Sequence, residues 1–164
     1  MLDAAALIKK HKAKGVLLDA NLLVLYLIGK VNPTRILNHK RTASYELADF
    51  RLLDGLVDGF GKPITIPHLL SQTSDLATLD GAERAQCRLI FKKLVQAMDE
   101  RYNESRLIVE DPTFSYLGLA DAAIAMASQN NLLVLTDDLA LHNALTQRGA
   151  DALNFNHVRQ LSWS

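Results

Sequence analysis

The chain has 164 residues, 49% hydrophobic and 22% charged, a balance that indicates one globular domain with a sizeable core and excludes a disordered chain. Its 18 basic and 18 acidic residues cancel, so the net charge gives no general attraction to nucleic acid, and an RNA-binding surface would need local clustering of charge. The single cysteine, Cys87, excludes an internal disulfide and fits a reducing compartment.

The first half of the chain alternates helical apolar spacing with short continuous apolar runs, which are typical of helices and of buried parallel strands. Gly15 ends the first helical pattern, and Asn21 is placed to cap the second. The expected elements, in order, are a helix over residues 2–14, a strand over 16–18, a helix over 22–30, a short helix over 34–40, a helix over 44–60, a strand over 64–66 and a helix over 69–79.

The second half continues the alternation and contains the clearest strand of the sequence, Leu132-Leu133-Val134-Leu135-Thr136. Gly149 is a fitting C-terminal stop for the helix after that strand. The expected elements are a long helix over residues 81–102, a short strand or extended loop over 106–109, a turn at Asp111-Pro112, a helix over 119–130, a strand over 132–136, a helix over 139–148 and a last short strand over 152–156.

Strands that alternate with helices predict an α/β fold, with a central, mostly parallel sheet covered by helices on both faces. The longest apolar stretch, residues 22–28, is too short to cross a bilayer, and the basic N-terminal segment follows apolar residues, the reverse of a signal peptide. We therefore expect one domain over residues 1–164 in a cytoplasmic protein that does not enter a membrane.

Four aspartates stand out because three of them follow predicted strands. Asp19 ends the first strand, Asp137 and Asp138 follow the strand over 132–136, and Asp121 lies near the start of an alanine-rich helix. Three of them have a simpler interpretation: Asp138 as a helix cap, Asp121 as a cap or first-turn residue, and Asp19 as an Asx turn with Asn21 as the true cap. Since the carboxyl ends of parallel strands meet at one sheet edge, we expect Asp19 and Asp138 to converge there.

Converging carboxylates repel one another, and a divalent cation would remove that conflict. Oxygen ligands favour Mg²⁺ or Mn²⁺ over Zn²⁺, and the five histidines show no paired zinc-binding pattern. Such an ion can polarise a phosphate and activate a water as nucleophile.

In the order and spacing of these segments, the sequence resembles a PIN domain. The resemblance covers about residues 15–155 and rests on Val16-Leu17-Leu18-Asp19-Ala20-Asn21, on the segment 64–76, on Leu119-Ala120-Asp121-Ala122-Ala123-Ile124, and on Leu133-Val134-Leu135-Thr136-Asp137-Asp138. PIN domains are three-layer α/β/α proteins, and many are metal-dependent endoribonucleases, including VapC-type toxins of toxin–antitoxin pairs.

The resemblance implies a role for each matching residue. Asp19, Asp121 and Asp138 would be catalytic metal ligands, with Asp137 as an adjacent alternative to Asp138. Thr136 would support the site through its hydroxyl group, and Asn21 would be a neighbour of the ligands.

Two departures from the family pattern bear on activity. Gln72 stands where the family usually has a glutamate, which keeps an oxygen acceptor but loses a negative charge. Asp75, one turn along, could partly substitute, or it could be a solvated helix residue. In addition, residues 33–62 form a longer segment than compact toxins have, which favours a branch of the family outside the toxin pairs.

That longer segment is locally basic. Arg35, Lys40 and Arg41, together with His39 and Arg51, could contact RNA phosphates, or they could form a solvated face. The apolar faces of the helices over 44–60 and 81–102 could cover the sheet or pair two subunits, so a homodimer is also expected.

The leading hypothesis is a Mg²⁺- or Mn²⁺-dependent endoribonuclease that acts on RNA, with an antitoxin protein as a partner if the chain is a toxin. The alternative is a catalytically weakened PIN-like module that binds RNA or a protein, because of Gln72. A phosphohydrolase of another α/β fold is disfavoured, since Asn21 occupies the position of the second acid in the Asp-x-Asp pattern of such enzymes.

Overall fold

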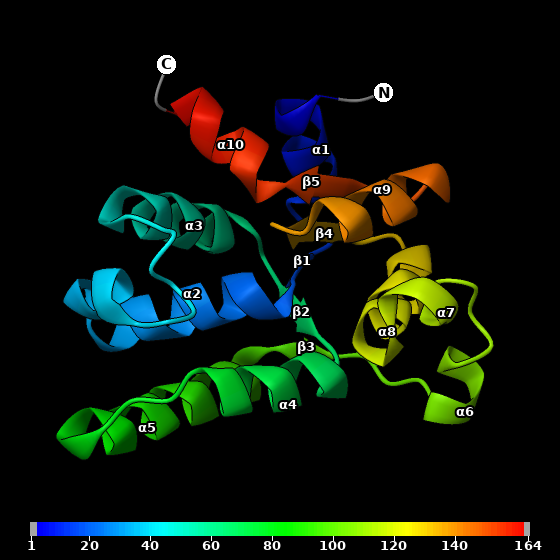
Figure 1. Ribbon diagram of the computed structural model, residues 1–164. Helices are drawn as coiled ribbons and strands as arrows, with labels where there is room; N and C mark the ends of the chain where they lie inside the picture. The colour runs from blue at the N-terminus through cyan, green and yellow to red at the C-terminus, as the bar shows by residue number, and fades with distance from the viewer. Residues whose placement is uncertain (1–2, 163–164) are drawn as a thin grey trace.

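Five parallel strands form one central sheet in the computed structural model, which describes residues 3–162 (Figure 1). The spatial order is β3-β2-β1-β4-β5, and every neighbouring pair is parallel. The strands are β1 (Val16–Leu18), β2 (Pro63–Thr65), β3 (Asp99–Glu100), β4 (Leu133–Thr136) and β5 (Ala152–Asn154).

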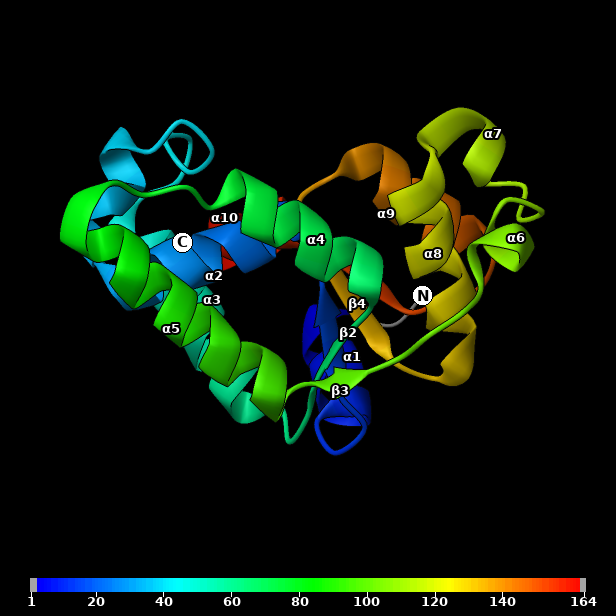
Figure 2. The ribbon, with the colours of Figure 1, turned by 90° about the horizontal axis from the view of Figure 1, so that it is seen from below.

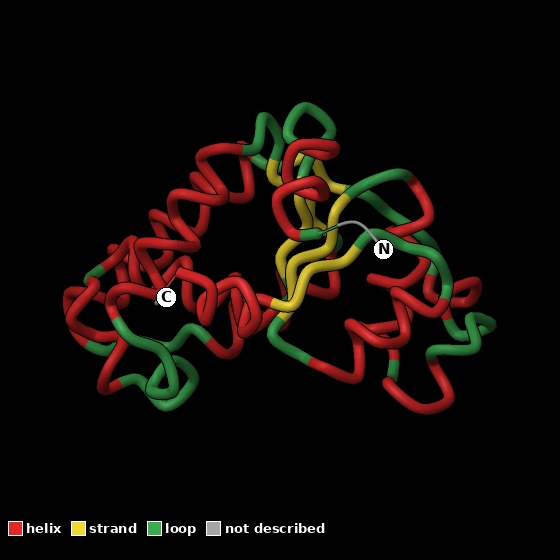
Figure 3. The backbone as a smooth tube through the Cα atoms, turned by 90° about the horizontal axis from the view of Figure 1, so that it is seen from above, coloured by secondary structure: helices red, strands yellow, loops and turns green. Residues whose placement is uncertain are grey.

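Helices connect the strands and cover both faces of the sheet, which confirms the three-layer α/β/α architecture (Figures 2 and 3). The α-helices are α1 (Ala4–His11), α2 (Ala20–Val31), α3 (Leu47–Gly59), α4 (Pro67–Leu76), α5 (Gly81–Ala97), α6 (Ser105–Ile108), α7 (Phe114–Leu117), α8 (Leu119–Ala127), α9 (Leu139–Gln147) and α10 (Phe155–Ser162). Two 3₁₀ segments, η1 (Pro33–Asn38) and η2 (Ser128–Asn130), complete the described elements. None of the helices between residues 3 and 162 has both the length and the apolarity needed to span a bilayer.

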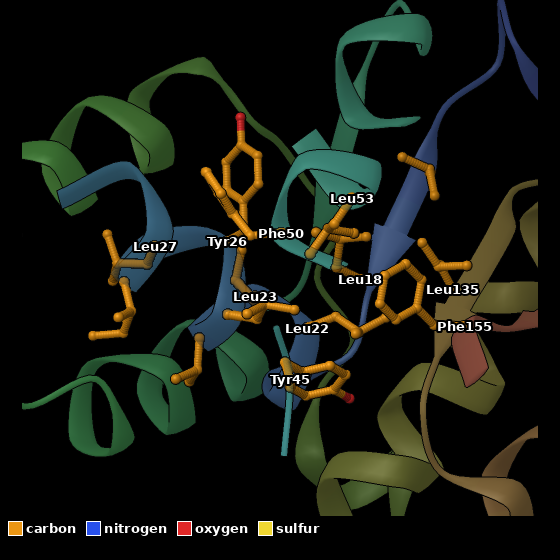
Figure 4. Close-up of a cluster of buried hydrophobic side chains, with 14 of the residues drawn as sticks. Leu18, Leu22, Leu23, Tyr26, Leu27, Tyr45, Phe50, Leu53, Leu135 and Phe155 are labelled. Carbon is orange, nitrogen blue, oxygen red and sulfur yellow. The ribbon is translucent and has the colours of Figure 1, made fainter. Parts of the chain in front are cut away.

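The alternation of side chains along β1 divides the interior into two cores. Val16 and Leu18 pack with α2, α3 and α5, whereas Leu17 packs on the opposite face with α8 and α9. Figure 4 shows part of the first core, where Leu22, Leu135 and Phe155 lie together. Both β1 and β4 are buried on both faces, which explains why their sequences are continuous apolar runs.

A glycine allows α2 and α3 to approach closely. A Cβ atom on Gly29 would overlap the ring of Phe50, so any larger residue would require the ring or the two helices to shift. Gly149, with a φ of 76°, follows α9 in the left-handed conformation, which confirms the predicted stop.

Several predicted elements require correction. Residues 106–109 do not form a strand or an extended loop, because residues 105–108 form the helical turn α6. The long helix ends at Ala97 rather than at residue 102, and the two residues of β3 follow it. The segment over 34–40 is a 3₁₀ helix, and the last strand ends at Asn154, where α10 begins. Leu2, in the predicted first helix, lies outside the described residues.

Candidate functional site

The carboxyl ends of β1 and β4 lie side by side at the centre of the sheet. Leu18 pairs with Leu135, and Asp19 donates its backbone N–H to the carbonyl of Leu135 at 3.1 Å. The chain runs from β1 to β2 and β3 on one side, then continues to β4 and β5 on the other. Ligands of open parallel sheets bind at such a reversal of strand order, which is where Asp19, Asp137 and Asp138 are found. The expected meeting of these strand ends is therefore confirmed.

Asp19 is buried and accepts hydrogen bonds from three directions. Its Oδ1 accepts the N–H of Leu22 at 2.9 Å, and its Oδ2 accepts the N–H of Asp137 at 3.0 Å as well as the hydroxyl of Thr136. Asp19 is thus the cap of α2, and the prediction that Asn21 caps this helix is wrong. Asn21 is exposed and contributes to the site in another way.

Burial, together with the neighbouring carboxylate of Asp137, raises the pKa of Asp19 to about 7. The hydrogen bonds from Thr136, Leu22 and Asp137 lower the pKa and offset part of this effect. The ionised carboxylate is therefore electrostatically unfavourable despite its three donors, and a nearby cation would stabilise it.

Asp137 is held by donors from three separate parts of the chain. Asn21 donates Nδ2–H to its Oδ1 at 3.2 Å, the hydroxyl of Tyr45 donates to its Oδ2, and Asn156 donates Nδ2–H to its backbone carbonyl at 3.1 Å. Burial, together with the hydrogen bond to Asp137, raises the pKa of Tyr45 well above its usual value, so the phenol remains a donor. Asp137 thus has a fixed orientation beside Asp19.

Asp138 and Asp121 form a second carboxylate pair. Asp138 is exposed and caps α9, because its Oδ1 accepts the N–H groups of Ala140 at 2.8 Å and Leu141 at 3.1 Å. Asp121 lies half-buried in the first turn of α8. Burial and, to a smaller extent, the charge of Asp138 raise the pKa of Asp121 to about 6.

Thr136 links the Asp19–Asp137 pair to the Asp138–Asp121 pair. Its hydroxyl group donates to Asp19 and accepts the backbone N–H of Asp138 at 3.0 Å. The side chain is fully buried, so its position is fixed by the end of β4. The structure therefore brings together Asp19, Thr136 and Asp137 most closely, whereas sequence reasoning gave Asp138 the first role.

Two residues on α4 do not join this hydrogen-bonded group. Gln72 and Asp75 are both exposed, and within residues 3–162 no hydrogen bond or ion pair connects either of them to the four aspartates. Helix α4 packs against α2 and α8, so it borders the two helices that begin at Asp19 and near Asp121.

The predicted basic residues differ in their surroundings. Arg35 pairs with Glu83, with Nη2 at 2.6 Å and Nε at 2.8 Å from the same carboxylate oxygen. Lys40 and Arg41 are exposed in the loop between η1 and α3, which is the loop that carries Tyr45. Of the three, Lys40 and Arg41 are better placed to contact a phosphate.

The carboxylate oxygens of Asp19 and Asp137 are ligands of the kind that Mg²⁺ and Mn²⁺ prefer. In the part of the chain that the structure describes, no three His, Cys, Asp or Glu side chains lie close enough to form a metal-binding group. Mg²⁺, however, is commonly held by one or two carboxylates and keeps several waters. Asp19 and Asp137 supply two such carboxylates, and the raised pKa of Asp19 reflects in part a repulsion that an ion would remove.

No protein-family model matches the chain, and no curated protein shows significant similarity to it.

Sequence reasoning missed Tyr45 and Asn156 as neighbours of the site. Tyr45 is 92 positions from Asp137 along the chain, and neither Tyr45 nor Asn156 lies in a recognisable motif. Their positions follow from the packing of the 39–46 loop and of α10, which a local pattern does not encode.

Proposed function

We propose that the protein is a metal-dependent endoribonuclease that hydrolyses RNA phosphodiester bonds at the carboxyl edge of its sheet. One observation carries the proposal: Asp19 and Asp137, from adjacent parallel strands, lie beside each other in surroundings that raise the pKa of Asp19 to about 7. A perturbed carboxylate pair at the strand-order reversal is a feature of functional sites. The choice of RNA as substrate rests on the resemblance of the sequence to PIN domains.

Asp19 and Asp137 would hold the cation, with Thr136 and Asn21 fixing the two carboxylates. When bound, Mg²⁺ or Mn²⁺ would supply charge stabilisation at a phosphate and a lower pKa for a water ligand. Asp121, with its pKa raised to about 6, would accept a proton from an attacking water at neutral pH. Asp138, already the cap of α9, would sustain that raised pKa through its charge.

The direct test is RNA cleavage with Mn²⁺ by wild type, Asp137→Asn and Asp121→Asn. Asp137→Asn removes a proposed metal ligand and should lose about 10–100-fold in rate. Asp121→Asn removes the proposed proton acceptor and should lose about 100-fold or more. Glu110→Gln, which changes an exposed acid away from the strand ends, is the matched control and should cut as wild type does. Undiminished cleavage by Asp137→Asn would refute the assignment of this site.

A second candidate is a weakened PIN-like module that binds RNA or a protein without cutting. The exposed, uncharged Gln72 favours it, as does the finding that no three His, Cys, Asp or Glu side chains of the described residues form a metal-binding group. Cleavage by Gln72→Glu but not by wild type would establish this alternative. An antitoxin partner and a homodimer remain predictions from the sequence.

A further inference from the structure

The C-terminal helix reaches the candidate metal site through a buried tyrosine. Tyr45 is 3% exposed, and its ring packs against Phe155 of α10 with the centroids 6.1 Å apart (Figure 4). Its hydroxyl group donates to Oδ2 of Asp137. The packing against Phe155 needs only the aromatic ring of Tyr45, so the hydroxyl group is available for its hydrogen bond to Asp137.

Arg159 of α10 holds the other side of this tyrosine. Its guanidinium lies over the Tyr45 ring, 5.0 Å from the centroid, and its Nη2 lies 3.1 Å from Oδ2 of the fully buried Asp49. It also donates to the carbonyl of Ser44 at 3.4 Å, next to Tyr45 in the chain. Arg159 therefore fixes the position of Tyr45 from a helix distant in sequence.

The same helix also holds the backbone of Asp137. Asn156 donates to the carbonyl of Asp137 at 3.1 Å and accepts from Nη1 of Arg159 at 3.4 Å. Asp137 is thus held at its carboxylate by Tyr45 and at its carbonyl by Asn156, and Arg159 contacts both of these residues.

We propose that Tyr45 is a positioning residue, which orients Asp137 for metal binding and makes α10 a structural part of the site through Arg159 and Asn156. This inference rests on the proposed function, because it requires that Asp137 bind a metal. Partners that orient a metal ligand commonly contribute about 10–100-fold to metal affinity.

The test is the dissociation constant of Mn²⁺, measured by electron paramagnetic resonance of the metal ion with wild type, Tyr45→Phe and Tyr102→Phe. Tyr45→Phe keeps the ring contacts and removes the hydroxyl, so Mn²⁺ should bind about 10–100-fold more weakly while the fold is retained. Tyr102 is 73% exposed, so Tyr102→Phe is the matched control and should bind as wild type does. Equal affinity of wild type and Tyr45→Phe would overturn the inference while leaving the proposed function intact.

Arg159→Gln supplies a second variant, which leaves the tyrosine hydroxyl in place. If α10 acts through Tyr45, this variant weakens Mn²⁺ binding, and the double variant is no weaker than Tyr45→Phe. Additive losses would overturn the path from Arg159 through Tyr45. Failure of wild type to bind Mn²⁺ would overturn the proposed function and, with it, this inference.

Discussion

At the scale of the residue, the site is defined by carboxylates that the fold makes costly to ionise. Asp19 is surrounded by donors, which would clash with the amide group of an asparagine, so Asp19→Asn combines a structural and a functional effect. An asparagine at Asp137 or Asp121 should disturb the fold less than one at Asp19. In Asp137→Asn the hydroxyl of Tyr45 can accept from the new amide group, and Asp121 is only half-buried. Variants of these two residues separate chemistry from stability.

The raised pKa of Asp121 makes its contribution to stability depend on pH. Its pKa is about 6 in the folded protein against an ordinary value of 3.8, so the folded state binds more protons between these pH values. The stabilisation by the protonated carboxyl is present below the unfolded pKa and is lost as the pH rises through about 6. In metal-free urea unfolding, Asp121→Asn should therefore gain stability relative to wild type as the pH rises across this range. A difference that is constant with pH would contradict the assigned shift.

The hydroxyl of Thr136 is expected to stabilise the fold as well as the site. Thr136→Val leaves the Asp19 carboxylate and the Asp138 N–H each without this partner, at a cost of about 1–3 kcal/mol. Thr146→Val, which removes a partly exposed hydroxyl on α9, should have a much smaller effect. Denaturant unfolding of both variants measures the difference, and similar losses would contradict the role given to Thr136.

At the scale of the element, apolar patterns predict the central strands but not the edges of the fold. The runs in β1 and β4 are continuous because these strands are buried on both faces, and this burial is what the sequence displays. β3 consists of the exposed Asp99 and Glu100 at an edge, so no apolar signal marks it. The α10 helix is mostly polar, and its place is explained by tertiary contacts with Tyr45, Asp49 and the first core rather than by an apolar pattern.

The close approach of α2 and α3 gives a prediction at this scale. Gly29→Ala should destabilise the protein by about 1–3 kcal/mol, because the added methyl overlaps the Phe50 ring. Gly55→Ala is the control: nothing lies within 4 Å of its Cβ position on α3, so it should stabilise the helix by about 0.5–1 kcal/mol. Thermal unfolding compares the two, and a neutral Gly29→Ala would show that the Phe50 ring or the helices can shift without cost.

At the scale of the whole molecule, the strand order 3-2-1-4-5 determines where the acids meet. The sequence predicts that Asp19 and the Asp137-Asp138 pair follow strands, and parallel pairing then brings them to one edge. Which acid lies nearest Asp19 depends on side-chain partners from the 39–46 loop and from α10, and these are tertiary contacts. For that reason the meeting of the strand ends could be predicted, whereas the closer approach of Asp137 than of Asp138 to Asp19, and the contact of Tyr45 with Asp137, could not.

The most direct test of the site is calorimetric titration of the protein with Mn²⁺ at about pH 6.5. Repeating it in buffers of different ionisation enthalpy counts the protons released on binding. Because the pKa values of Asp19 and Asp121 are about 7 and about 6, the wild type should bind Mn²⁺ with release of protons, and the release should diminish at higher pH. Asp137→Asn should bind about 10–100-fold more weakly. Absence of binding by the wild type at millimolar metal, or equal binding by Asp137→Asn, would contradict a metal site at the ends of β1 and β4.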